Sequence, residues 1–153
     1  MPLVTWSFGL TLPGMWWTYA LLSAVFAALT AILAKVGVRG IDSNLATAVR
    51  TSFIVPLAWG VVAVQGNLGL VGGIARAPWL YLGLSAAATG ASWLCYFKAL
   101  QLGPASLVSA VDKSSLALTI LLAAMFLGET LTWRTAAGCG LILAGVAVIA
   151  WPA

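Results

Sequence analysis

The sequence predicts an all-α, polytopic membrane protein with five transmembrane helices. Of its 153 residues, 63% are hydrophobic and only 7% are charged, and the mean hydropathy is +1.09. A soluble domain needs about a quarter of its residues charged to cover its surface, so lipid must be the solvent for much of this chain. The apolar residues fall into five runs separated by short polar turns, and a helix needs roughly 20 such residues to cross a bilayer.

The composition argues against several classes of protein. The net charge is +4, but the seven basic residues are scattered and form no run, which speaks against a nucleic-acid-binding protein. There is no histidine, so the commonest metal ligand and general base is missing, and we expect neither a metal site nor a cofactor. The two cysteines, Cys95 and Cys139, lie in separate apolar runs, and we expect them to be packing residues and not a disulfide.

Two segments are expected: an apolar N-terminal extension, residues 1–14, and a five-helix transmembrane domain, residues 15–153. The extension lacks the basic segment that opens a signal peptide. The first helix is predicted over residues 15–36, because no charge occurs before Lys35 and aromatic residues that favour the membrane interface stand at its start. Lys35 can extend its long side chain toward the lipid head groups at the end of this helix.

The second helix is predicted over residues 45–65, after a short polar turn that contains Asp42. Ser43 or Asn44 is expected to cap its first turn, because a short polar side chain can accept the free N–H groups there. Pro56 is expected to kink the helix, since proline removes one backbone hydrogen bond.

The third helix is predicted over residues 78–102, after a glycine-rich loop. Its middle, residues 85–92, consists of small side chains that allow close contact between helices in lipid. Trp93, Tyr96 and Lys98 follow near its end. A very short turn then makes the third and fourth helices antiparallel neighbours.

The fourth apolar segment carries the feature on which the functional interpretation depends. Its uncharged part, residues 114–127, is too short to span a bilayer, so the helix must start near Pro104 to reach the roughly 20 residues required. Asp112 and Lys113 then lie roughly 10–12 Å inside the helix start. Ionisable groups at that depth usually face a bundle interior or water, and they indicate a functional site.

The fifth helix is predicted over residues 135–151. The connection before it contains Glu129 and Arg134. Glu129 is expected to cap this turn or to pair with Arg134, so we assign both residues a structural role.

The charges on one side of the membrane are predicted to converge. Because successive helices run in opposite directions, the turn between helices one and two and the turn between helices three and four must share one side. Asp112 then has Arg50, Lys35 and Lys98 as candidate partners. Lys113 is rotated by about 100° on the same helix and is not expected to pair with Asp112. Two interpretations stay open: a structural ion pair that fixes helix register, and a hydrated half-cavity for substrate or ions.

Three stretches in the C-terminal half carry a family resemblance: residues 105–114, the Phe-Leu-Gly-Glu-Thr-Leu-Thr-Trp exit at 126–133, and residues 137–146. They resemble the EamA-type repeat of the drug/metabolite transporter superfamily. The first helix and the following turn, residues 21–35 and 42–50, are similar to the five-helix bacterial and archaeal group within that superfamily. The resemblance covers nearly the whole chain after residue 14.

The resemblance implies a transporter built from a single EamA-like repeat. Full-length relatives have ten helices in two inverted five-helix repeats with the substrate path between them, so a single repeat must find its second half in another chain. We therefore expect an antiparallel homodimer of dual-topology subunits in the cell (inner) membrane. The small difference in positive charge between the two sides agrees with this expectation. Small multidrug exporters of the superfamily carry an acid in helix one, which is absent here, so their coupling mechanism does not transfer.

Together these observations predict a secondary active transporter that moves a small polar solute or metabolite by alternating access. Its expected partners are the lipid bilayer and the solute. Asp112 is expected to respond to protons or ions, and Arg50 and Lys113 to contact the substrate. Trp93 and Tyr96 either line the path or anchor their helix at the membrane interface.

A non-transporting membrane subunit, such as a flippase partner or an assembly factor, is the alternative, because intramembrane charges can also serve docking. An intramembrane enzyme is disfavoured. The sequence has no histidine, no nucleophile elbow and no pair of intramembrane acids that could form a protease dyad.

Overall fold

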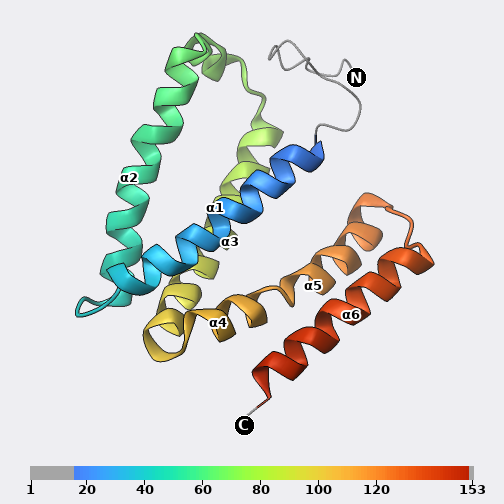
Figure 1. Ribbon diagram of the computed structural model, residues 1–153. Helices are drawn as coiled ribbons and strands as arrows, with labels where there is room; N and C mark the ends of the chain where they lie inside the picture. The colour runs from blue at the N-terminus through green and yellow to red at the C-terminus, as the bar shows by residue number, and fades with distance from the viewer. Residues whose placement is uncertain (1–15, 152–153) are drawn as a thin grey trace.

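A computed structural model of the chain describes residues 16–151, and nearly all of them are helical (Figure 1). The α-helices are α1 (Trp16–Gly37), α2 (Ser43–Val64), α3 (Arg76–Leu102), α4 (Ala105–Asp112), α5 (Ser115–Leu122) and α6 (Trp133–Ala150). A short 3₁₀ helix, η1 (Leu68–Gly73), precedes α3, and a π-helical turn, η2 (Ala123–Leu127), follows α5. Residues 16–151 contain no strand, so the predicted all-α class is confirmed. The predicted extension, residues 1–14, lies outside the described residues.

Four helical segments of the described chain are long and apolar enough to cross a membrane. They are Trp16–Gly37, Ser43–Val64, Ala105–Leu127 and Trp133–Ala150. α3 is longer, with 27 residues, but it is not among the four, because small and polar side chains fill its middle and lower its mean hydropathy. Four of the five predicted spans are therefore supported. The remaining span, the third in the chain (α3), stays a prediction.

The start of α2 differs from the prediction. The helix begins at Ser43, and Asp42 caps it by accepting hydrogen bonds from the backbone N–H groups of Asn44 (2.9 Å) and Leu45 (3.0 Å). The expectation that Ser43 or Asn44 supplies the cap is wrong. The carboxylate of Asp42 reaches the free N–H groups of the first turn, and its negative charge also complements the positive end of the helix dipole.

The fourth apolar segment forms a helical span from Ala105 to Leu127, as predicted, but its hydrogen-bond pattern is not uniform. α4 ends at Asp112 and α5 begins at Ser115. Between them the N–H of Ser114 donates to the carbonyl of Val111 (3.0 Å), a tighter pattern than the α-helix uses. The Ser114 hydroxyl also donates to the Val111 carbonyl (2.7 Å), and such local side-chain bonds compete with regular helix. The charged dipeptide Asp112–Lys113 therefore stands at a tightened, 3₁₀-like turn of the membrane-spanning segment, where Lys113 and Ser114 keep right-handed helical backbone angles.

The helices form an open arrangement with little interior. α3 contacts α1, α2 and α4, and α6 packs beside α4 and α5. Figure 1 shows α5 and α6 side by side, well away from α2. Outside the contacts between helices, most large apolar side chains of residues 16–151 are exposed, as expected where lipid replaces water as the solvent.

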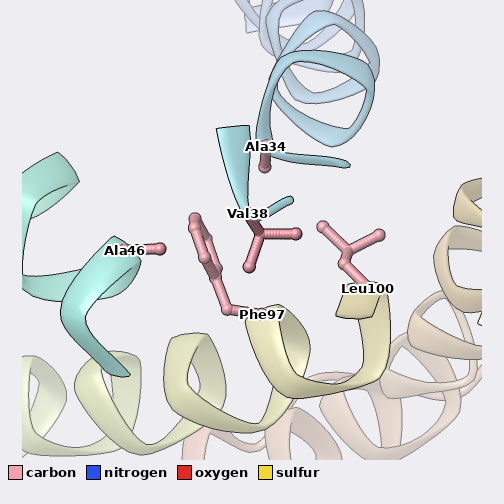
Figure 2. Packing of buried hydrophobic residues seen from close by; sticks show 5 residues of the cluster. All are labelled: Ala34, Val38, Ala46, Phe97 and Leu100. Carbon is pink, nitrogen blue, oxygen red and sulfur yellow. The ribbon is translucent and has the colours of Figure 1, made fainter. Parts of the chain in front are cut away.

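The small core lies at one end of the bundle. Figure 2 shows its side chains, which come from the end of α1 and the turn after it, the start of α2 and the end of α3. They are Ala34, Val38, Ala46, Phe97 and Leu100. The side-chain amide of Gln101 donates to the carbonyl of Ile41 (2.6 Å), which joins the α3 end to the α1–α2 turn. The prediction that the α1–α2 and α3–α4 turns share one side is therefore confirmed.

Candidate functional site

A cavity of about 650 Å³ lies between α1, α3 and α4, with one side chain from α2. Small side chains of α1 form one wall, and aromatic and polar side chains of α3 and α4 form the others. Its lining residues are Ser23, Ala24, Phe26, Ala27, Ala28, Thr30, Arg50, Ser92, Trp93, Tyr96, Phe97, Ser109, Asp112 and Lys113. Ala24 and Ala28, which form a small-residue stripe typical of helix packing, are exposed here and border open space.

Arg50 enters the cavity from the second turn of α2 and is half-buried. Its guanidinium carbon lies 4.3 Å from the ring centroid of Trp93 and 5.8 Å from that of Phe97. Arginine is attracted to the negative face of an aromatic ring at such distances. This contact joins α2 to α3 and holds the charge of Arg50 at the cavity wall.

Asp112 pairs with Lys113 and not with Arg50, Lys35 or Lys98. The Lys113 ammonium lies 3.8 Å from the Asp112 carboxylate, the only ion pair among residues 16–151. The expectation that Lys113 does not pair with Asp112 is wrong, because the long, exposed Lys113 side chain reaches the carboxylate of its neighbour although the two residues point in different directions from the helix. The Lys113 side chain is 63% exposed and the Asp112 side chain is 44% exposed, so water screens the ion pair and the attraction between the two charges is weak. Asp112 therefore remains available to another partner.

Tyr96 and Ser109 connect α3 to α4 within the cavity. Their hydroxyl oxygens lie 3.1 Å apart, and both residues are partly buried. Trp93, one turn earlier on α3, presents its ring to Arg50. Both aromatic residues line the cavity.

Lys35 and Lys98 lie outside this cavity. The Lys35 ammonium donates to the backbone carbonyls of Leu100 (2.5 Å) and Gly103 (2.8 Å), at the end of α3. The last carbonyls of a helix lack partners within the helix, and a nearby cation satisfies them. Lys98 is exposed on α3. The cavity thus unites five of the seven residues predicted for the pathway: Arg50, Trp93, Tyr96, Asp112 and Lys113.

Several lining residues were not predicted as site residues. Ser23, Ser92 and Ser109 carried a usable signal, since each is a hydroxyl inside an apolar run. Phe97 could not be recognised as a site residue from the sequence, because an aromatic side chain near a helix end is common in any membrane protein.

A second, apolar groove of about 440 Å³ lies between α1 and α2. Its walls include Leu33, Phe53 and Leu57, which are mostly exposed. Arg50 and Phe97 border this groove and the polar cavity alike. Arg50 therefore stands between an apolar compartment and a polar one.

The remaining predicted residues lie at turns. Thr132, and not Glu129, caps α6 by accepting from the backbone N–H of Thr135 (3.2 Å). Glu129 is exposed in the connection before α6 and forms no ion pair with Arg134 within the described chain. Neither residue touches the polar cavity.

Comparison with known proteins places this geometry in context. Residues 14–151 match the profile of the family described as "EamA-like transporter family". A protein of Sinorhizobium sp. named "Uncharacterized transporter in cobO 3'region" is 45% identical over 135 residues. The alignment covers 88% of this chain and 96% of that protein. No solved structure matches the chain.

Proposed function

Because this chain belongs to the EamA-like transporter family, we propose that it is a secondary active transporter that moves a small polar solute by alternating access. Its family and its several apolar helices make it a multi-pass membrane protein. The observation that carries the proposal is the polar cavity of about 650 Å³, because it gathers Arg50, Asp112 and Lys113 within the helical body.

The cavity has the properties of a solute site within a membrane. Charged side chains inside a bilayer are costly unless they face water or one another, so this group is best accommodated by a hydrated space. The tightened turn between α4 and α5 adds a second argument, because it lies beside the cavity at Asp112 and Lys113. A mid-helix stretch of 3₁₀ geometry often marks a functional hinge or local strain.

Asp112 is the proposed proton- or ion-responsive group. Its pairing with Lys113 is loose and its side chain is 44% exposed, so a proton or a cation can reach the carboxylate. Arg50 and Lys113 would contact the substrate, and Trp93 and Tyr96 would form the wall of the path. Loss of the negative charge on Asp112 would free Lys113, which changes the electrostatics of the site.

A second copy of the chain, inserted in the opposite direction, is the proposed other half of the path. In a single chain the polar cavity is open to its surroundings. Exposing its charged and hydroxyl side chains to lipid would be energetically costly. An isologous contact between two copies would cover such a face. The alignment with the relative from Sinorhizobium sp. covers 88% of this chain and 96% of that protein, so the two sequences are of similar length. The proposed location of this dimer is the cell (inner) membrane.

Flux measurements in reconstituted vesicles test the proposal. Vesicles with an imposed pH gradient would be screened with amino acids, organic acids and cationic drugs. We expect at least one solute to accumulate, and Asp112→Asn to abolish its proton-driven uptake. The matched control is Asp42→Asn, which removes the same charge from a residue outside the cavity and should retain uptake.

Normal proton-driven uptake in Asp112→Asn would contradict the coupling role of this carboxylate. Absence of uptake for every solute, together with a changed assembly state in Asp112→Asn, would favour the alternative function of a non-transporting membrane subunit.

A further inference from the structure

Arg50 is the cation of the polar cavity that has no carboxylate partner within residues 16–151. We propose that Arg50 binds the carboxylate of the transported solute, so that the substrates are small carboxylate-bearing anions. This inference rests on the proposed transport function and names its substrate class.

Within residues 16–151, the N–H donors of Arg50 form no hydrogen bond or ion pair, and its recorded contacts are with aromatic rings. The guanidinium carbon lies over the Trp93 ring at 4.3 Å, in the position of a cation–π contact. The N–H donors of a guanidinium lie in its plane and form a fork that fits the two oxygens of a carboxylate. A guanidinium stacked on an aromatic ring can therefore still bind a carboxylate through two parallel hydrogen bonds.

The charge of the cavity favours the same class of ligand. Asp112 pairs with Lys113 at 3.8 Å, and their formal charges cancel. The charge of Arg50 remains, so the lining of the cavity has a net positive formal charge. Arg50 belongs to a membrane-spanning helix and is half-buried, and an unneutralised cation there is costly. A bound monoanion removes this imbalance.

An anionic lipid head group offers similar chemistry, because the apolar groove between α1 and α2 also reaches Arg50. The lining of the polar cavity favours a solute. It presents the hydroxyl groups of Ser92, Ser109 and Tyr96, which an acyl chain could not use. Its volume of about 650 Å³ also lies within the range of about 300–1,000 Å³ typical of small-molecule sites.

A thermal-unfolding assay with matched ligands tests the inference. The full chain would be reconstituted in nanodiscs of phosphatidylcholine, which carries no net charge. Each of three ligand sets would contain a carboxylic acid, its primary amide and an amine of the same carbon skeleton. We expect at least one acid to raise Tm and its amide and amine to leave Tm unchanged.

Three variants assign the effect to Arg50. Arg50→Gln should remove the Tm increase produced by the acid. Arg50→Lys keeps the charge but loses the planar fork, so we expect about a tenfold weaker apparent affinity. Arg39→Lys makes the conservative change at an exposed turn residue outside the cavity, keeps the balance of positive charge, and should bind the acid normally. Arg50→Lys also serves if Arg50→Gln does not fold.

Three results would overturn the inference: no acid raises Tm at tens of millimolar, only amides or amines raise it, or the acid raises the Tm of Arg50→Gln or Arg50→Lys as much as that of Arg39→Lys. Nanodiscs containing phosphatidylglycerol, an anionic lipid, distinguish binding of a soluble acid by Arg50 from binding of a lipid head group. An Arg50-dependent rise in Tm from this lipid alone, without any acid effect, would assign Arg50 to a head group and also overturn the inference. Proton-driven uptake of an amine or a neutral solute that requires Asp112 would overturn the substrate class while leaving the transport function intact.

Discussion

Lys35 and Gly103 are 68 residues apart in the sequence, yet the Lys35 ammonium donates to the Gly103 carbonyl at 2.8 Å. The same ammonium also binds the carbonyl of Leu100. The Lys35 side chain, from α1, thus caps the C-terminal end of α3, directly before the turn that leads to α4. The small buried core lies at this same end, so the contact holds together the part of the bundle in which the chain is packed most tightly.

Lys35→Met should lower stability, because it keeps a long apolar stem but leaves two partly buried carbonyls without their donor. Hydrogen bonds that involve a charged group contribute about 1.5–3 kcal/mol each, so a clear fall in the midpoint of thermal unfolding is expected. The measurement is thermal unfolding in detergent or nanodiscs. Lys98→Met is the matched control, since Lys98 is exposed on α3 and should tolerate the change. Equal losses for the two variants would show that the Lys35 contact contributes nothing specific.

Tyr96 and Ser109 should behave as a coupled pair. Tyr96→Phe and Ser109→Ala each remove one member of the 3.1 Å contact between α3 and α4. Side-chain hydrogen bonds within membrane proteins contribute about 0.6 kcal/mol on average. We therefore expect each single variant to lose a few tenths to about 1 kcal/mol, and the double variant to lose less than the sum. Unfolding in denaturant with all four proteins measures this coupling, and strict additivity would contradict the contact.

Antiparallel assembly requires that both orientations occur in the membrane. Reporters fused to the C-terminus, one active only inside the cell and one only outside, should therefore both give signal. The exposed turn residue Arg39 supplies a control, because Arg39→Glu shifts the weak balance of positive charge. This change should enrich one population and reduce transport. Signal from one side alone in the native chain would remove the dual-topology proposal.

The membrane class and the positions of the helices follow from sequence alone, because both are local properties. Hydropathy decides whether a segment of about 20 residues is better solvated by lipid or by water, and lipid leaves helix as the structure that satisfies its backbone. The sequence singles out Asp112 and Lys113 as a candidate site for the same reason, since two adjacent charges inside an apolar run conflict with their solvent. Arg50, Trp93 and Tyr96 were also named in advance and do line the cavity.

The tertiary structure decided which of these side chains meet. Arg50 contacts the Trp93 ring instead of pairing with Asp112, because α2 and α3 bring the ring centroid within 4.3 Å of the guanidinium carbon. Lys35 binds the end of α3 and stays out of the cavity, since its carbonyl partners come from residues 65 and 68 positions away. Hydropathy reports the depth of a side chain in the membrane, but not the rotation of its helix. Only packed helices fix that rotation, and with it the partner that each charge finds.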